Sequence, residues 1–338
     1  MTEWNKIALK LSASGMNAHE ISDYLNEAGY PELTHNGVRT FLYRYKKRIK
    51  EGAMAPKNNL GIPEEDIEKY DVKPKQITIV QNTEPVVHGT DWDSSVKSIT
   101  FGVVGDTHIG SKYAQLTYLH DFYDMLEDRG ITSVYHTGDV SDGIKMRPGH
   151  EYELCDVSYD EMVADIIANY PKRKNITTYF ITGNHDASVY KHIGADIGIS
   201  IADKRHDMIY LGRDAAVVFL TPKCSMELRH PWDGTAYAIS YKTQKLIEAM
   251  EADSKPNILC VGHYHKAEYI FYRNVHCLQT ACFQSQTPFT RGKGMAVHTG
   301  GWIVTVNVDS QGSVVSIVPE FIPFYKCIKD DYKNFRLD

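Results

Sequence analysis

The chain has 338 residues, of which 42% are apolar and 24% are charged, and its formal net charge is −6. This composition is ordinary for a globular protein and argues against a disordered or fibrous chain. No apolar run approaches the roughly 20 residues that cross a bilayer, and the first residues lack the apolar core of a signal peptide. A cytoplasmic protein with no membrane partner is therefore expected.

The first 50 residues are predicted to form three short helices. Asn17 can cap the second helix, and Gly29 and Pro31 separate it from a third helix over 36–50. This third helix has no acidic residue and carries six basic ones: Arg39, Arg44, Lys46, Lys47, Arg48 and Lys50. Residues 1–50 have a net charge of +3, which leaves −9 for the rest of the chain.

A compact three-helix segment with a basic last helix is typical of a helix-turn-helix, whose final helix enters the major groove of DNA. We predict that residues 1–50 form a small all-α helix-turn-helix domain and bind DNA through those six basic side chains. The alternative is a solvated basic helix that packs against the acidic remainder of the chain or mediates homo-oligomerisation.

Residues 51–97 are predicted to be a linker. Four prolines interrupt this segment, and its nine acidic residues outnumber its five lysines. Such a composition disfavours a packed core. One strand is expected within it, over residues 76–80.

From residue 98 onward, patterns of strand and helix alternate. Strands are predicted over 98–104, 133–137, 176–182, 215–220 and 257–261, and helices over 113–128, 159–168 and 239–251. After His265 the pattern contains strands only, over 267–272, 275–279, 302–308 and 314–318. This order predicts an α/β domain over 98–325 with two packed sheets, followed by a C-terminal tail over 326–338.

Polar residues that can bind metal follow the predicted strands at their carboxyl ends, where α/β sheets place their ligands. They occur in the segments GDTHIG, GDVSDG, GNHD, RHP and GHYH, as Asp106, His108, Asp139, Asn184, His185, His230, His263 and His265. Glycines that precede or flank them would let the backbone turn sharply. Each segment alone is as consistent with a simple turn, but their joint order indicates a metal site. Carboxylate, imidazole and amide ligands without thiolate suit Mn, Fe or Zn.

These segments, in this order, resemble the calcineurin-like metallophosphoesterase superfamily over about residues 98–320. The resemblance implies a two-sheet β-sandwich flanked by helices and a site for two divalent ions. One ion would be bound by Asp106, His108 and His265, and the second by Asn184, His230 and His263, with Asp139 bridging them. His185 corresponds to the catalytic histidine of that superfamily, which does not bind metal. Asp186 would orient His185 or would only close the turn.

The implied chemistry is hydrolysis of a phosphoester. Two ions roughly 3.5–4 Å apart clamp a phosphate and lower the pKa of a shared water, so that hydroxide attacks phosphorus at neutral pH. His185 can protonate the leaving oxygen or stabilise charge on the phosphate. We expect manganese, with iron, zinc, nickel or cobalt as alternatives.

The residues directly after two of the motifs narrow the substrate class. Ser/Thr phosphatases of the superfamily usually carry arginine directly after GDxVD and glutamate after GNH, whereas this chain has Gly143 and Asp186 there. GDTHIG with GNHD is more similar to the DNA-repair exonuclease branch. We therefore expect a nuclease or phosphodiesterase that acts on nucleic acid. The alternatives are an enzyme for nucleotides or other small phosphoesters, or a DNA-binding regulator with secondary phosphoesterase activity.

A helix-turn-helix joined to a phosphoesterase also resembles proteins of bacteriophage and prophage. A phage origin would place the protein in the cytoplasm of a bacterial host.

Overall fold

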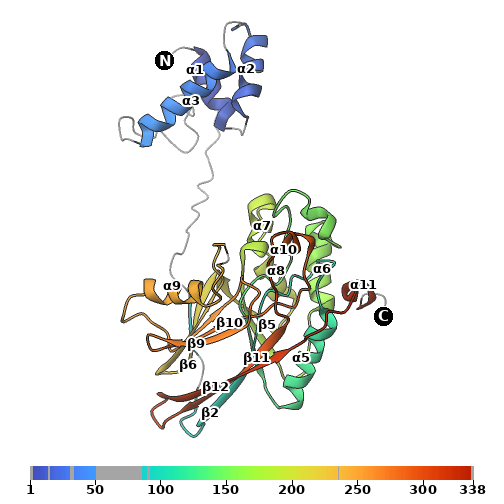
Figure 1. The fold of residues 1–338 in the computed structure, drawn as a ribbon, viewed down its shortest axis with the longest axis vertical. Coiled ribbons are helices and arrows are strands. Elements are labelled where there is room, and N and C mark those ends of the chain that lie inside the picture. The colour runs from blue at the N-terminus through green and yellow to red at the C-terminus, as the bar shows by residue number, and fades with distance from the viewer. Residues whose placement is uncertain are drawn as a thin grey trace. The chain divides into compact units, whose positions relative to one another are not determined.

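The computed structural model describes residues 3–13, 16–30, 34–50, 86–89, 92–234 and 236–335. The chain divides into two compact units, Met1–Gln81 and Asn82–Asp338 (Figure 1). Among the described residues, every helix is too short or too polar to cross a bilayer.

In the described part of the first unit, residues 3–50, the chain forms three helices, as the sequence predicts: α1 (Glu3–Ala13), α2 (Ala18–Glu27) and α3 (His35–Lys50). The side chain of Asn17 accepts a hydrogen bond from the backbone N–H of Glu20, and the Glu20 carboxylate accepts one from the N–H of Asn17. This reciprocal cap fixes the start of α2. Ala8, Ile21, Leu25, Val38 and Leu42 form a small buried core between the helices. That the unit binds DNA stays a prediction.

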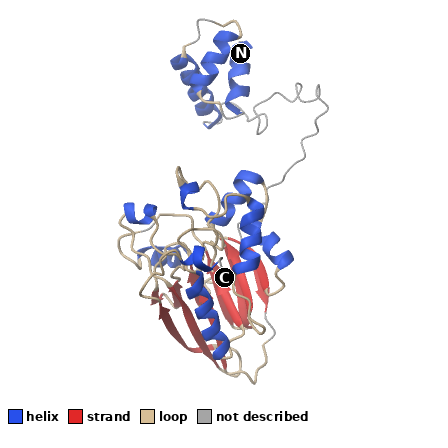
Figure 2. Cartoon of the chain, turned by 90° about the vertical axis from the view of Figure 1, so that its right-hand side faces the viewer, coloured by secondary structure: helices blue, strands red, loops and turns tan. Residues whose placement is uncertain are grey.

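The second unit contains two six-stranded sheets (Figure 2). One sheet has the order β12-β11-β2-β3-β4-β5, with bounds Val314–Pro323, Gly300–Val308, Ser98–Val104, Ser133–His136, Thr177–Thr182 and Met208–Arg213. Strands β2 to β5 are parallel, and β11 is antiparallel to both β2 and β12. The other sheet has the order β1-β6-β7-β8-β10-β9, with bounds Val86–Gly89, Ala215–Thr221, Cys224–Arg229, Ile258–Val261, Val275–Gln279 and Glu268–Tyr272.

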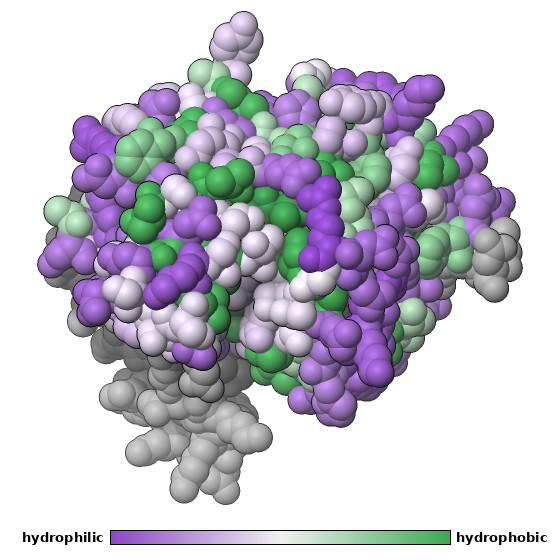
Figure 3. Space-filling model, turned by 90° about the horizontal axis from the view of Figure 1, so that it is seen from below, coloured by the Kyte–Doolittle hydropathy of each residue, from purple (hydrophilic) through white to green (hydrophobic). Residues whose placement is uncertain are grey.

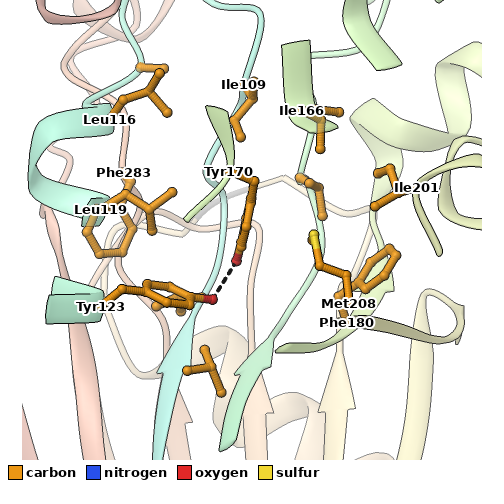
Figure 4. Close-up of a cluster of buried hydrophobic side chains, with 14 of the residues drawn as sticks. Ile109, Leu116, Leu119, Tyr123, Ile166, Tyr170, Phe180, Ile201, Met208 and Phe283 are labelled. Atoms are coloured by element: carbon orange, nitrogen blue, oxygen red, sulfur yellow. Dashed lines mark hydrogen bonds between the residues drawn. The ribbon is translucent and has the colours of Figure 1, made fainter. Parts of the chain in front are cut away.

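Helices cover the outer faces of the two sheets. The first sheet packs against α5 (Leu116–Asp128), α6 (Tyr159–Asn169) and α8 (Ile197–Lys204) through a large apolar cluster, in which the buried hydroxyls of Tyr123 and Tyr170 hydrogen-bond each other at 2.9 Å (Figure 4). The second sheet packs against α9 (Tyr241–Ala249). The α/β sandwich implied by the resemblance is confirmed.

Successive side chains of β2 point to opposite faces of the sheet, so this strand contributes to two layers of the apolar core. Phe101 and Val103 belong to the apolar cluster between the sheets, whereas Val104 belongs to the cluster under the helices. Gly102 also faces the helices, and a Cβ atom there would lie only 2.7 Å from Leu126 of α5. Glycine at this position therefore lets the helix approach the sheet closely.

On the face seen in Figure 3, hydrophobic side chains occur in small groups among hydrophilic ones.

Both predicted boundaries of the main domain differ from the structure. Strand β1 lies within the segment predicted as linker, yet it pairs in parallel with β6, with Val86 opposite Ala216. The expected strand over 76–80 lies outside the described residues. In the predicted tail, α11 (Asp331–Phe335) packs on α5, because Tyr332 is fully buried and the Asp331 carboxylate accepts hydrogen bonds from Thr117. The folded unit therefore begins before residue 98 and extends beyond residue 325.

Candidate metal centre

The seven predicted ligands lie at the carboxyl ends of strands from both sheets. Asp106 and His108 follow β2, and Asp139 follows β3. Asn184 is the first residue of α7 (Asn184–Ile193), directly after β4. From the second sheet, His230 follows β7, and His263 and His265 follow β8. The structure thus brings together residues that are up to 159 positions apart in the sequence, between Asp106 and His265.

Asp106, His108 and His265 form one group of potential ligands, with their ligand atoms within 4.8 Å of one another. The Nε2 atoms of His108 and His265 are 3.0 Å apart, and His265 Nε2 lies 3.3 Å from Asp106 Oδ1. Two imidazole nitrogens and a carboxylate oxygen therefore converge on one point. This donor set fits a divalent transition ion.

Asp139, His230 and His263 form a second such group. His230 Nε2 lies 3.2 Å from Asp139 Oδ2 and 3.1 Å from the amide oxygen of Asn184. The same Oδ2 atom lies 3.9 Å from His108 Nε2 in the first group. Asp139 therefore lies between the two groups, within 4 Å of a histidine from each, where a bridging ligand would lie.

Outer hydrogen bonds fix which nitrogen of each imidazole faces the centre. His230 Nδ1 donates to the carbonyl oxygen of Thr137 at 2.8 Å, and His108 Nδ1 contacts Asp142 Oδ1 at 2.9 Å. His263 Nε2 donates to the carbonyl oxygen of Asp233 at 2.7 Å. These contacts leave Nε2 of His230 and His108, and Nδ1 of His263, for an ion.

Most of the candidate ligands have a backbone conformation that is uncommon for residues other than glycine. Their φ angles are positive: 51° at Asp106, 46° at His108, 56° at Asp139, 79° at His263 and 55° at His265. Such strain persists only where the surrounding structure imposes it, and it concentrates at functional sites. The sharp turns are made by the ligands themselves.

Of the neighbouring glycines, Gly138 has the expected positive φ, of 97°, whereas Gly105 and Gly183 have a different role. Gly183 does not have a positive φ, but a Cβ atom there would lie 2.3 Å from Asp139 Oδ1. A Cβ atom at Gly105 would lie 2.2 Å from Thr137 Oγ1. These glycines are required because the ligand loops pack against one another, rather than because the chain turns there.

Asp142 and His150 belong to the site but were not predicted. The carboxylate of Asp142 contacts three histidines: His108 at 2.9 Å, and His150 and His185 at 3.3 Å each. His185 Nδ1 also donates to the backbone oxygen of Asp142 at 2.7 Å. Burial alone would lower the pKa of His185, but Asp139 and then Asp142 raise it to about 9. Asp142 is therefore the residue that orients His185 and helps to keep it charged.

Asp186 does not orient His185. Its buried carboxylate accepts hydrogen bonds from the backbone of Gly183 at 3.0 Å and Val140 at 3.1 Å, and from the hydroxyl of Ser141 at 2.7 Å. It thus closes its own turn and ties the loop after β4 to the loop after β3. Of the two roles expected for Asp186, the catalytic one is therefore wrong and closure of the turn is observed.

The two candidate ion sites open into a cleft of about 520 Å³. His108, Asp139, Asn184, His185, His263 and His265 line it, together with Arg147 and Phe289. A substrate phosphate in the cleft could therefore reach both ligand groups and His185.

We expect metal binding to release protons and to strengthen as the pH rises. Burial lowers the pKa of His230, but Asp139 raises it to about 9 in the metal-free site, so the imidazole carries a proton at pH 7 that an ion must displace. Manganese affinity should therefore increase up to about pH 9. Titration calorimetry at pH 7 in buffers of different ionisation enthalpy measures the proton release, and His230→Asn should reduce it. Equal affinity at pH 6 and pH 9 would contradict this expectation.

Of the predicted DNA-binding side chains, Arg39 is exposed on α3. The side chains of Arg44, Lys46, Lys47, Arg48 and Lys50 lie outside the described ones.

The chain resembles known proteins across the unit that holds this site. Residues 99–267, half of the chain, match the calcineurin-like phosphoesterase family. The DNA polymerase II small subunit of Halobacterium salinarum is 24% identical over 231 residues, which cover 57% of this chain and 45% of that protein. The small subunit of Pyrococcus horikoshii is 26% identical over 257 residues, which cover 62% and 40%. The chain thus spans less than half of either relative.

Two solved structures were also matched. An archaeal phosphodiesterase is 12% identical, with a TM-score of 0.38 over 66% of this chain and 100% of that one. Vps29 from Entamoeba histolytica, solved with zinc, is 14% identical, with a TM-score of 0.33 over 67% and 99%. On the match to residues 99–267, this protein belongs to the calcineurin-like phosphoesterase family.

Proposed function

We propose that the protein is a two-metal phosphodiesterase that hydrolyses phosphodiester bonds of nucleic acid. The observation that carries the proposal is the pair of ligand groups that lie on either side of Asp139 and open, beside His185, into one cleft. The choice of nucleic acid is supported by the basic helix α3 and by the similarity to DNA polymerase II small subunits.

Each residue of the centre has a role in this proposal. Asp106, His108 and His265 would hold one ion, Asn184, His230 and His263 the other, and Asp139 both. When bound, two divalent ions supply Lewis acidity for a phosphoryl oxygen and a nucleophile at neutral pH. Because His185 Nδ1 is engaged by Asp142, its Nε2 is the nitrogen left to face substrate. A protonated His185 can donate from Nε2 to the leaving oxygen.

A comparison of substrates tests the proposal. Protein loaded with manganese is incubated with labelled single-stranded DNA, duplex DNA, RNA and bis(p-nitrophenyl) phosphate, and initial rates are compared. We expect cleavage of nucleic acid. Hydrolysis confined to the small ester would favour nucleotides or other small phosphoesters as substrates. No hydrolysis with manganese, iron, zinc, nickel or cobalt would overturn the proposal.

We expect EDTA to abolish activity and manganese to restore it better than magnesium. The candidate ligands include four imidazoles, at His108, His230, His263 and His265, and magnesium prefers oxygen ligands. Activity after chelation and stepwise addition of each ion measures this preference. Full activity with magnesium alone would contradict the assignment of the imidazoles as ligands.

Reversing the charge of Lys46, Lys47 and Arg48 to glutamate is expected to weaken DNA binding and to flatten its salt dependence. Each phosphate that a basic side chain neutralises releases counterions, and four such contacts give a log–log slope of roughly −3.6 on duplex DNA. Fluorescence anisotropy at several salt concentrations measures the slope.

A matched control reverses three exposed lysines of the second unit, Lys172, Lys174 and Lys191, with the same change in net charge. The control should bind DNA more tightly than the first variant, and both should hydrolyse bis(p-nitrophenyl) phosphate at the wild-type rate. If the first variant and wild type bind DNA equally well, α3 is not a DNA-binding element.

A further inference from the structure

We propose that Arg147 and Phe289 form a platform that binds a nucleobase of the substrate, next to the phosphate held at the metal centre. This inference rests on the proposed function and names how its substrate class would be selected. The guanidinium carbon of Arg147 lies over the ring of Phe289, 4.3 Å from the ring centroid. Both residues line the cleft that contains the candidate ligands and His185.

The platform is held in place from two separate segments of the chain. Arg147 Nη2 forms an ion pair at 2.5 Å with Oε2 of Glu153, which is largely buried in the short 3₁₀-helix η2 (His150–Glu153). Phe289 belongs to α10 (Pro288–Gly292), whose first turn is fixed by a hydrogen bond from the N–H of Thr290 to Thr287 Oγ1 at 3.2 Å. Because both partners are anchored, little conformational freedom would be lost when a planar ligand stacks on them.

The pair is also connected to the catalytic histidine. His150 begins the same 3₁₀-helix that ends in Glu153, and its Nε2 contacts Asp142 Oδ2 at 3.3 Å. Asp142 in turn orients His185. The 3₁₀-helix η2 therefore contacts both Arg147, through Glu153, and Asp142, through His150. A base on the platform and a leaving group at His185 would be positioned by the same short helix.

The chemistry of the platform fits a nucleobase. Phe289 is 40% exposed, so its ring is not needed to fill the apolar core. Arginine guanidinium planes and phenylalanine rings are the side chains on which unpaired bases stack. Lys293 lines the same cleft and adds a second cation beside Arg147, where the phosphates that flank a base carry negative charge. An alkyl phosphoester offers no flat π-surface to this pair.

Two phosphodiesters with the same leaving group test the platform: thymidine 5′-(p-nitrophenyl phosphate) and methyl p-nitrophenyl phosphate. We expect wild type to prefer the nucleoside ester, measured as kcat/KM. Phe289→Leu should lower that preference by about fivefold or more, which is the smallest loss usual when a base-stacking aromatic side chain is removed. The change should appear chiefly in KM. Phe289→Tyr keeps a ring and should restore the preference. Arg147→Gln should lower it as well.

Phe271→Leu is the matched control, because Phe271 is 59% exposed on β9 and does not line the cleft. Its preference should equal that of wild type. Calorimetric binding of thymidine 5′-monophosphate provides a readout apart from turnover and should weaken in Phe289→Leu but not in Phe271→Leu. Thermal melting checks that the variants are folded.

Two failures are distinguishable. If wild type hydrolyses both esters without preference, and Phe289→Leu and Arg147→Gln leave the preference and the nucleotide affinity unchanged, the platform is wrong and the phosphodiesterase stands. If wild type hydrolyses neither ester with any of the candidate metals, the proposed function is wrong and the platform with it.

Discussion

Replacing Asp139 by alanine is expected to remove bound metal from both sites and to lower phosphodiester hydrolysis by orders of magnitude. Asp139 Oδ2 lies between the two ligand groups, 3.2 Å from His230 Nε2 and 3.9 Å from His108 Nε2, and is the proposed bridging atom. Without this carboxylate, the second group has no anionic ligand and the first keeps only Asp106, so the imidazoles hold an ion less strongly against competing protons. Metal content by mass spectrometry and turnover of bis(p-nitrophenyl) phosphate are measured on the same preparation.

The fold should survive this substitution, because Asp139 lies in a loop at a strand end and outside the apolar clusters. Asp139→Asn removes the negative charge but keeps the size of the side chain. Its amide oxygen can still accept the hydrogen bond from the backbone N–H of His185, which is 2.8 Å in the structure. Asp165→Asn alters another buried aspartate, on α6, and serves as the control with normal metal content. Turnover near wild type with both ions retained would exclude Asp139 as the bridging ligand.

Of the five strands that precede the candidate ligands, β2, β3, β4 and β8 could be predicted closely, because their apolar runs end at polar motifs, whereas no strand was predicted where β7 precedes His230. The bounds predicted for β2 and β10 match the structure, and β3, β4 and β8 differ by one residue at one end. The helix α7 and its neighbour α8 were not predicted. The sequence that opens α7, Asn184-His185-Asp186, resembles a turn, and Gly194 interrupts the apolar pattern between the two helices. The helical start is instead imposed by tertiary contacts of Asp186.

The candidate ligands could be predicted because each lies in a short motif, whereas their supporting residues could not. His150 has no motif around it, and only the folded chain brings it to Asp142 and buries it completely. Asp142 was present within GDVSDG, three residues after Asp139, but sequence spacing does not indicate that it contacts three histidines. The sequence left two roles open for Asp186, because adjacency to His185 suggested a contact as well as a closed turn, and only the folded chain shows that its carboxylate closes the turn.

Replacing His185 by glutamine is expected to lower turnover by about 10²–10⁴-fold, the usual contribution of a general acid, while both ions remain bound. His185 Nδ1 is engaged by the backbone oxygen of Asp142 at 2.7 Å, and the side chain lines the cleft. The loss should be smaller for a p-nitrophenyl ester, whose leaving group needs no proton, than for DNA. The main alternative is that His185 is itself a metal ligand, since it also lies within 4.8 Å of ligand atoms of His108 and Asp139. The metal content of His185→Gln decides between the two roles.

The dependence on pH gives an independent test of the same assignment, through Asp142→Asn. In the metal-free site burial opposes protonation of His185, but Asp139 and then Asp142 raise its pKa to about 9, so the acid form is favoured at neutral pH and is lost as the pH rises through the folded pKa. Removing the charge of Asp142 lowers this pKa, and the alkaline limb of the kcat profile should therefore move to lower pH. His185→Gln should lack that limb. If metal is lost from His185→Gln, or if Asp142→Asn leaves the limb in place, His185 is not the proton donor that Asp142 positions.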